Sequence, residues 1–251
     1  MSKPRTASDT AKAGLMPSTG GERQPEYCDS HISDTAQGVS GLSATVEVQR
    51  SVVGANDSAD VLDSFASCLG LTRLKVAYVS TPITTGRRYY DWLSASRKAP
   101  TSIADQSAGH RTVINANEVS AHTLVKKVRA HYVHLTIVDP TALRAATWSQ
   151  NDFHDFWARL ITNYVGRVIF NEGWEYSTGC CMEYAAAIDA GAELLDATLS
   201  PLPPSLALVK TQSAVDRLLA EGHSVANLVA ARERIMRASI NWASASEESP
   251  R

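Results

Sequence analysis

The stretch that decides the fold is RVIFNEGWEYSTGCCMEYAAAIDAG, residues 167–191. It opens with a compact apolar run rich in β-branched residues, which is typical of a buried strand. It closes with a segment of helical character that stops at Gly191. The stretch therefore predicts a strand over 167–173 and a helix over 177–190, joined by a polar and aromatic loop.

The same alternation continues on both sides of this stretch. Further apolar runs predict three more strands: KVAYVS (75–80), YVHLTIVDP (132–140) and AELLDATL (192–199). The segments between them predict helices over 87–97, over 117–131 and from Ser149 onward, with a polar loop over 99–110. Strands that alternate with helices form a parallel sheet with right-handed crossovers. The predicted fold class is therefore α/β, a Rossmann-like (flavodoxin-like) three-layer parallel sheet.

Two flanking regions complete the predicted organisation. Residues 1–60 are rich in small and polar residues without sustained apolar periodicity, so we expect a mostly disordered arm, in which 45–53 alternates like a short strand. A short helix over 61–69 precedes the α/β domain, which spans 70–200. Residues 201–246 are predicted to be a C-terminal helical extension with helices over 213–220 and 223–242. Its candidate buried positions are Leu228, Ile235 and Ile240.

Composition excludes several classes of function. With a formal net charge of -2 over 251 residues, the chain has no basic surplus for binding a nucleic-acid polymer. No apolar run reaches the ~20 residues of a membrane span, and the N-terminus has no secretory pattern, so we expect a cytoplasmic protein. No metal, NAD or P-loop motif occurs, so no cofactor is predicted. The cysteines show no zinc pattern and are expected to be reduced thiols: Cys28, Cys68, Cys180 and Cys181.

In an open parallel sheet, ligands bind beyond the carboxyl ends of the strands. Here those ends are the loops at 80–83, 139–141 and 171–177. The third loop leads into a helix N-terminus, whose unpaired N–H groups suit a phosphate or another anion. Ser177 adds a hydroxyl there, and Gly179 lets the backbone approach a ligand closely. These loops are therefore the predicted ligand site.

Glu183 lies about a turn and a half inside that helix, among apolar neighbours. A helical glutamate is most often solvated or ion-paired. A partly buried carboxylate, in contrast, needs a partner, and such groups collect at functional sites. The residues alone leave both interpretations of Glu183 open.

Three pieces of the chain carry a family resemblance: VAYVSTPI (76–83), Val138-Asp139-Pro140 and GWEYSTGCCMEYA (173–185). They are similar to the nucleoside 2-deoxyribosyltransferase-like family, including its nucleoside 5′-monophosphate N-glycosidase branch. The third piece is the most specific, since it resembles the family's signature of Asp or Ser, one residue, Gly, three residues and the catalytic Glu. The resemblance covers about half of the chain, roughly 75–196, with Thr81 standing where the family usually has Gly.

The resemblance implies a role for each matching residue. Glu183 would be the nucleophile that attacks the anomeric carbon, and Tyr78 would orient its carboxylate. Ser177 stands where the transferase branch usually has Asp, and Ser is typical of relatives that accept 5′-monophosphates. Asp139 is the first candidate to protonate the departing base, ahead of Glu172 and Glu175. The substrate-binding residues predicted from the loops are Ser80, Thr81, Pro82, Asn171, Glu172, Gly173, Trp174, Ser177 and Gly179.

The predicted reaction is cleavage or transfer at the N-glycosidic bond of a (deoxy)nucleoside or nucleoside 5′-monophosphate through a covalent glycosyl-Glu intermediate. Water as the acceptor makes the enzyme a hydrolase, and a base makes it a transferase. The expected partner is therefore a small-molecule nucleoside or nucleotide. Because a neighbouring subunit often completes the pocket in relatives, the resemblance also implies a homo-oligomer.

Three points stay open at this level. Trp174 and Tyr176 either stack on the base or pack under their loop. A non-catalytic nucleotide-binding sensor or interaction module on the same fold is the main alternative to an enzyme. A weaker alternative treats the N-terminal arm and the basic segment 126–129 as an interaction platform, although a solvated helix face explains those charges more simply.

Overall fold

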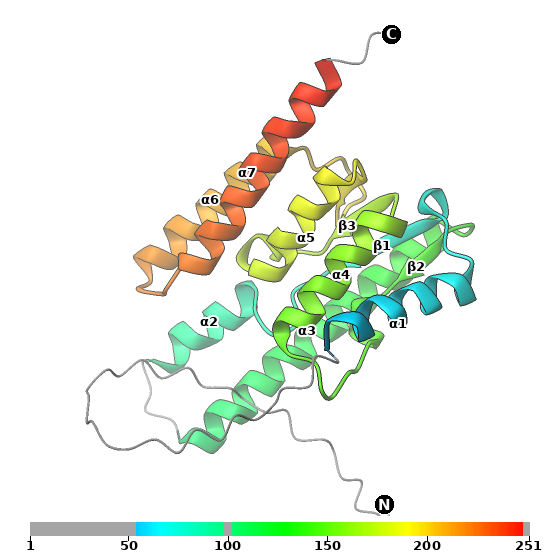
Figure 1. Cartoon of the computed structure of the whole chain (residues 1–251). Helices are drawn as coiled ribbons and strands as arrows, with labels where there is room; N and C mark the ends of the chain where they lie inside the picture. Colours follow the sequence, from blue (N-terminus) through cyan, green and yellow to red (C-terminus); the bar gives the residue numbers. More distant parts are fainter. Residues whose placement is uncertain (1–53, 98–101, 248–251) are drawn as a thin grey trace, which may run out of the picture. The chain divides into compact units, whose positions relative to one another are not determined.

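Residues 54–97 and 102–247 are described by the computed structural model, and within them four parallel strands form one sheet in the order β2-β1-β3-β4 (Figure 1). These residues lie within one unit of the chain, Thr45–Arg251. The strands are β1 Val76–Ser80, β2 Thr136–Val138, β3 Arg167–Phe170 and β4 Glu193–Asp196.

Helices connect and cover these strands. The α-helices are α1 Gly54–Leu69, α2 Arg87–Ser96, α3 Ile103–His131, α4 Gln150–Tyr164, α5 Thr178–Asp189, α6 Pro204–Ala220 and α7 Ala226–Glu247. Single 3₁₀ turns occur at η1 Arg73–Lys75, η2 Pro140–Ala142 and η3 Trp174–Tyr176. In this part of the chain, no helix combines the length and apolar character that a membrane crossing requires.

Side chains of the central strand β1 point alternately into two helical layers. Val76 and Tyr78 belong to a core shared with α1, α4 and α5, whereas Ala77 and Val79 belong to a core shared with α3. All five residues of β1 are buried, as expected for a strand covered on both faces. The predicted three-layer α/β fold with a parallel sheet is therefore confirmed.

The C-terminal helices belong to the first of these cores. α6 and α7 form a helical hairpin, and α7 packs along α5 (Figure 1). Their contribution to the buried cluster comes from these residues: Ala207, Ala214, Val215, Leu218, Leu228, Ala231, Ile235 and Ala238. The segment predicted as an extension therefore supports the helix that carries Glu183.

The predicted loop over 99–110 is wrong where the structure describes it. α3 begins at Ile103, well before the predicted start at 117. Ser102 caps this helix, since its hydroxyl accepts a hydrogen bond from the Asp105 amide, and the Asp105 carboxylate accepts one from the Ser102 amide in return. The first turns of α3 carry few apolar residues, so their helical state depends on this cap and leaves little periodicity to read.

Other boundaries also differ from the prediction. Only 136–138 of the predicted strand 132–140 pairs with β1. α6 begins at Pro204 rather than 213, because a proline is favourable in the first turn of a helix. Ile240 is 60% exposed rather than buried, since it lies five residues after Ile235 and so on another face of α7.

Only some of the predictions for the N-terminal region fall on residues that the structure describes. The predicted helix over 61–69 is confirmed and is longer, because α1 starts at Gly54. Residues 54–60 are thus helical rather than part of a disordered arm. The predicted strand over 45–53 and the remainder of the arm lie outside the described residues.

Candidate functional site

The carboxylate of Glu183 lies at the carboxyl end of β1 and receives hydrogen bonds on both oxygens. Tyr78 donates its hydroxyl to Oε1 at 2.9 Å, and Ser80 donates to Oε2 at 2.6 Å. Tyr78 and Ser80 are two residues apart on β1, so their side chains leave the strand on the same face, the face covered by α5. The parallel sheet therefore presents two hydroxyls to one helical carboxylate.

Burial changes the acidity of this cluster. It raises the pKa of Glu183 to about 7, although the hydrogen bonds from Ser80 and Tyr78 act in the opposite direction. The pKa of Tyr78 is also raised, first by burial and then by the nearby charge of Glu183, so Tyr78 stays a donor. At neutral pH the carboxylate thus titrates, which makes it available both as a base and as a nucleophile.

Ser177 begins α5 next to this cluster. Its hydroxyl accepts a hydrogen bond from the Cys180 amide and another from Thr85 Oγ1 at 3.2 Å. Gly179, in the first turn, packs against a histidine of α4, since a methyl group on Gly179 would lie 3.1 Å from His154 Nε2. The structure thereby brings Ser177 and Gly179 to the N-terminus of the helix that holds Glu183.

Asn171 and Thr81 lie on the other face of the sheet. The buried Asn171 amide donates to Thr81 Oγ1 at 3.0 Å and to Ser120 Oγ at 3.1 Å, and its oxygen accepts from the Glu172 amide. These bonds join the loops that follow β1 and β3 to α3. Both residues were predicted to bind substrate, and their observed contacts fix the loops.

Asp139 caps the turn that follows β2. Its carboxylate accepts hydrogen bonds from the amide of Thr141 at 3.0 Å and from the Thr141 hydroxyl at 2.6 Å. His122 Nε2 lies 3.7 Å from the same carboxylate. These contacts hold Asp139 within its own turn.

A cavity of about 550 Å³ opens on the carboxyl side of β3 and β4. Predicted substrate-binding residues form one wall: Pro82, Asn171, Glu172, Gly173 and Trp174. The rest of the lining includes Glu175, a candidate proton donor, and residues without a predicted role, mainly Arg87, Arg88 and Asp91 of α2, Asp196, Thr198 and Lys210. Glu183, Tyr78 and Ser80 do not line it. The predicted site residues therefore divide into a carboxylate cluster and a cavity wall.

The aromatic residues of the third loop pack inward. Trp174 is 3% exposed and stacks on Tyr184 with ring centroids 5.0 Å apart and planes 12° apart. Tyr176 is also buried, with the Arg217 guanidinium 5.8 Å from its ring centroid. The packing alternative is the one observed for both rings, although Trp174 also reaches the cavity wall.

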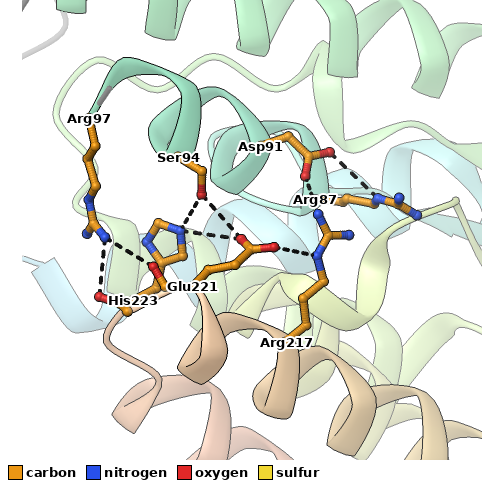
Figure 2. Close-up of polar contacts among 8 residues, drawn as sticks. Arg87, Asp91, Ser94, Arg97, Arg217, Glu221 and His223 are labelled. Atoms are coloured by element: carbon orange, nitrogen blue, oxygen red, sulfur yellow. Dashed lines mark hydrogen bonds and ion pairs between the residues drawn. The ribbon is translucent and has the colours of Figure 1, made fainter. Parts of the chain in front are cut away.

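Polar contacts fasten the α2 wall of the cavity to the turn between α6 and α7 (Figure 2). Asp91 contacts Arg87 and Arg217, at 3.6 Å and 2.6 Å. Ser94 Oγ lies 2.8 Å from His223 Nε2 and donates to Glu221 at 3.2 Å.

The sequence offered one signal that α2 lines the cavity, the pair of arginines after Gly86. That glycine has φ +92°, and a Cβ there would lie 2.6 Å from Pro82 Cβ.

Within the described residues, no group of three or more His, Cys, Asp or Glu side chains is arranged to hold a metal ion. Cys68, Cys180 and Cys181 are free thiols, as predicted, and Cys28 lies outside the described residues.

Comparison of the chain with protein-family models, with curated proteins and with solved structures gives no match.

Proposed function

We propose that the protein cleaves or transfers the N-glycosidic bond of a (deoxy)nucleoside or nucleoside 5′-monophosphate, with Glu183 as the nucleophile. The observation that carries this proposal is the Glu183 carboxylate, partly buried and held by the hydroxyls of Tyr78 and Ser80. A carboxylate with a raised pKa and two fixed donors fits a residue that must point one oxygen at a reacting carbon.

The chemistry follows the logic of a retaining glycosidase. A Glu183 oxygen forms a bond to the anomeric carbon, while the carbon–nitrogen bond to the base breaks and its electron pair leaves with the base. The oxocarbenium-like transition state is positive at the anomeric carbon, so the negative carboxylate stabilises it. Water or a second base then takes the sugar from Glu183, which distinguishes hydrolysis from transfer.

Two parts of the substrate are assigned to two parts of the site, the 5′-phosphate to the start of α5 and the base to the cavity. Ser177, Gly179 and the N-terminus of α5 suit a 5′-phosphate, because unpaired helical N–H groups attract anions. For the departing base, Glu172 and Glu175 line the cavity, whereas Asp139 is engaged by Thr141. Beyond the effect of burial, Asp139 in turn is close enough to raise the pKa of Tyr78 through its charge, so all three carboxylates stay candidate proton donors to the base.

A nucleotide-binding sensor without turnover is the second candidate. The observation that favours it is the cavity of about 550 Å³, whose lining does not include Glu183. A cavity of this size accommodates a nucleotide-sized ligand. In that case binding depends on the cavity wall, and the carboxylate cluster only supports the fold.

The deciding experiment incubates the full-length protein with ribo- and deoxyribonucleoside 5′-monophosphates and the matching nucleosides, with and without free bases. Chromatography follows base release and base exchange, and Glu183→Ala is the control. We expect release by the wild type and its loss in the variant; exchange would identify a transferase. Equal nucleotide binding by both proteins without any release would replace the enzyme proposal with the sensor.

Two further expectations belong to the same proposal. We expect a homo-oligomer, which light scattering of the purified protein measures directly. A cytoplasmic location is expected as well, and fractionation of the source cells tests it. A monomer in solution would require the site to be complete within one chain.

A further inference from the structure

Most charged side chains that line the cavity are engaged by one another. Asp91 lies between Arg87 and Arg217, at 3.6 Å and 2.6 Å (Figure 2). Asp196 is engaged by hydrogen bonds from its own turn and by the charge of Lys210. Three other charged side chains of the wall have no ion pair in the described part of the chain: Arg88, Glu172 and Glu175. A ligand in the cavity therefore meets one unpaired guanidinium and two unpaired carboxylates.

Arg88 is held at the wall by a buried amide. Its Nη1 donates to Asn117 Oδ1 at 3.1 Å, and Asn117 is 3% exposed. Both hydrogens of the Asn117 amide nitrogen are engaged, by the carbonyls of Ile83 at 2.9 Å and of Thr85 at 3.1 Å, so the amide oxygen must face the guanidinium. The contact uses one N–H group of Arg88, and the rest of the planar fork stays available to a ligand.

The unpaired carboxylates belong to the turn that meets the start of α2. A methyl group on Gly173 would lie 3.3 Å from Arg87 Cβ, so the first turn of α2 packs against the turn after β3. Arg88 is one residue beyond this contact and Glu172 is one residue before it. Glu175 follows within η3, and all three side chains line the same cavity. The guanidinium and the carboxylates thus lie on adjoining walls.

A ligand that satisfies these walls needs a pair of acceptors for the arginine and a pair of donors for a carboxylate. A phosphate group offers only acceptors, and its charge is repelled by the carboxylates. Among the common bases, guanine has both pairs: O6 and N7 accept, whereas N1–H and the 2-amino group donate. Adenine pairs its N7 acceptor with an amino donor, so it does not match a guanidinium.

We infer that the cavity recognises a guanine base, with Arg88 donating to O6 and N7 and one loop glutamate accepting from N1–H and the 2-amino group. This role rests on the proposed function, which places the base in the cavity. One glutamate is enough for the donor edge. The other glutamate and Asp139 therefore stay available as proton donors to the departing base.

The test measures binding, in Glu183→Gln, which leaves the substrate intact under the proposed mechanism. Calorimetry gives Kd for guanosine, adenosine and cytidine 5′-monophosphates, in the ribo and deoxyribo series. Two analogues each lack one recognised group: inosine 5′-monophosphate has no 2-amino group, and 7-deazaguanosine 5′-monophosphate has no N7. We expect the guanine nucleotide to bind most tightly, and each analogue to bind about tenfold more weakly or worse, because a hydrogen bond to a charged group is lost.

The Arg88 variants are made in the same background. Arg88→Met should weaken binding of the guanine nucleotide about 5- to 150-fold, the range for a bidentate arginine–guanine pair, and should bind the 7-deaza analogue equally well. Arg88→Lys keeps the charge without the planar fork and should also lose the guanine preference. Arg111→Met is the matched control, an exposed arginine of α3 outside the cavity lining, and should keep every Kd. Thermal unfolding shows whether each variant is folded.

The inference and the proposed function fail in different ways. Equal Kd values for the guanine and adenine nucleotides, or an equal loss for every nucleotide in Arg88→Met, overturns the role of Arg88. Failure of the wild type to release base, or release by Glu183→Ala, overturns the proposed function. A guanine preference without base release keeps the recognition by Arg88 and assigns it to a sensor.

Discussion

Two opposing influences act on the single carboxylate of Glu183. Burial raises its pKa and the hydroxyls of Ser80 and Tyr78 lower it, with a result of about 7. Only the ionised form attacks in the proposed reaction, so kcat/KM should rise with pH up to about 7 and then level. Ser80→Ala and Tyr78→Phe each remove a hydrogen bond to the charged form, worth roughly 1.5–3 kcal/mol. Each should therefore move this rise to higher pH by about one unit or more.

The larger shift is expected for Ser80→Ala, since the Ser80 bond is the shorter, 2.6 Å against 2.9 Å, and lowers the pKa of Glu183 more. Thr85→Val is the control, because it removes a hydroxyl that bonds Ser177 instead of Glu183. The measurement is the pH dependence of kcat/KM for all four proteins on one nucleotide. A rise that stays at the same pH in both hydroxyl variants contradicts the geometry.

The same carboxylate should affect stability in a defined direction. Glu183 has an ordinary pKa of 4.5 and a folded pKa of about 7, so the folded state holds the proton more tightly. The stability that this group contributes is present below pH 4.5 and is lost as the pH rises towards 7. Glu183→Gln does not titrate. Relative to the wild type, its free energy of unfolding should increase by about 2–3 kcal/mol between pH 5 and pH 8. Urea unfolding of both proteins at pH 5 and at pH 8 measures the two free energies. A difference between the proteins that is the same at both pH values would contradict the raised pKa of Glu183.

Local spacing placed Glu183 inside a helix and Tyr78 within a strand, but only the family resemblance paired the two side chains, and their hydrogen bond is present in the structure. The role of Ser80 was less visible. Its position in the first loop suggested substrate binding, whereas the period of two along β1 turns it towards the Glu183 carboxylate. No local pattern showed how Arg88 would be held, since Asn117 lies 29 residues away and meets it only when α2 packs against α3.

At the scale of elements, polar contacts help to position α2. It has no fully buried residue, and it is held to the turn between α6 and α7 by Ser94, His223 and their neighbours (Figure 2). Burial and the charge of Arg97 lower the pKa of His223, although Glu221 opposes them. The folded state therefore favours the neutral ring, and the stability that it contributes is present above the ordinary pKa of 6.5 and falls as the pH falls below it.

The lowered pKa of His223 predicts how the contact between α2 and the turn after α6 responds to acid. The stability difference between the wild type and His223→Gln should be larger at pH 7.5 than at pH 5.5. Glu183 is present in both proteins, so its opposite pH dependence cancels in the difference. Denaturant unfolding at the two pH values measures the gap. A gap that widens in acid would mean that His223 is held in its charged form.

Element ends were predictable where a cap coincides with an apolar pattern. Ser149 was assigned correctly, because the helix that it caps buries Phe156, Trp157, Leu160 and Ile161 soon afterwards. Ser102 forms the same capping box, but α3 opens with mostly polar turns, and the pattern becomes readable only near its second half. A cap without a following apolar stripe is a weak signal, which explains the wrong loop over 99–110.

At the scale of the whole molecule, alternating strands and helices fixed the layer architecture, because a parallel sheet must be covered on both faces. The pattern did not reveal where the C-terminal helices would pack. Their apolar positions show only that one face is buried, not which partner buries it. In the structure that partner is α5, so the helix with the proposed nucleophile lies between the sheet and the hairpin of α6 and α7.

Two adjacent leucines of α6 test whether this hairpin belongs to one cooperative unit. Leu218 is fully buried, whereas Leu219 is 56% exposed. Leu218→Ala should lower the free energy of unfolding by about 2–5 kcal/mol, because it removes core contacts and leaves a cavity. Leu219→Ala should change it by less than about 0.5 kcal/mol. If the hairpin and the sheet share one core, Leu218→Ala shifts a single transition seen equally by circular dichroism and tryptophan fluorescence. An independent extension would instead unfold first, as a separate step, and leave the main transition at its wild-type midpoint.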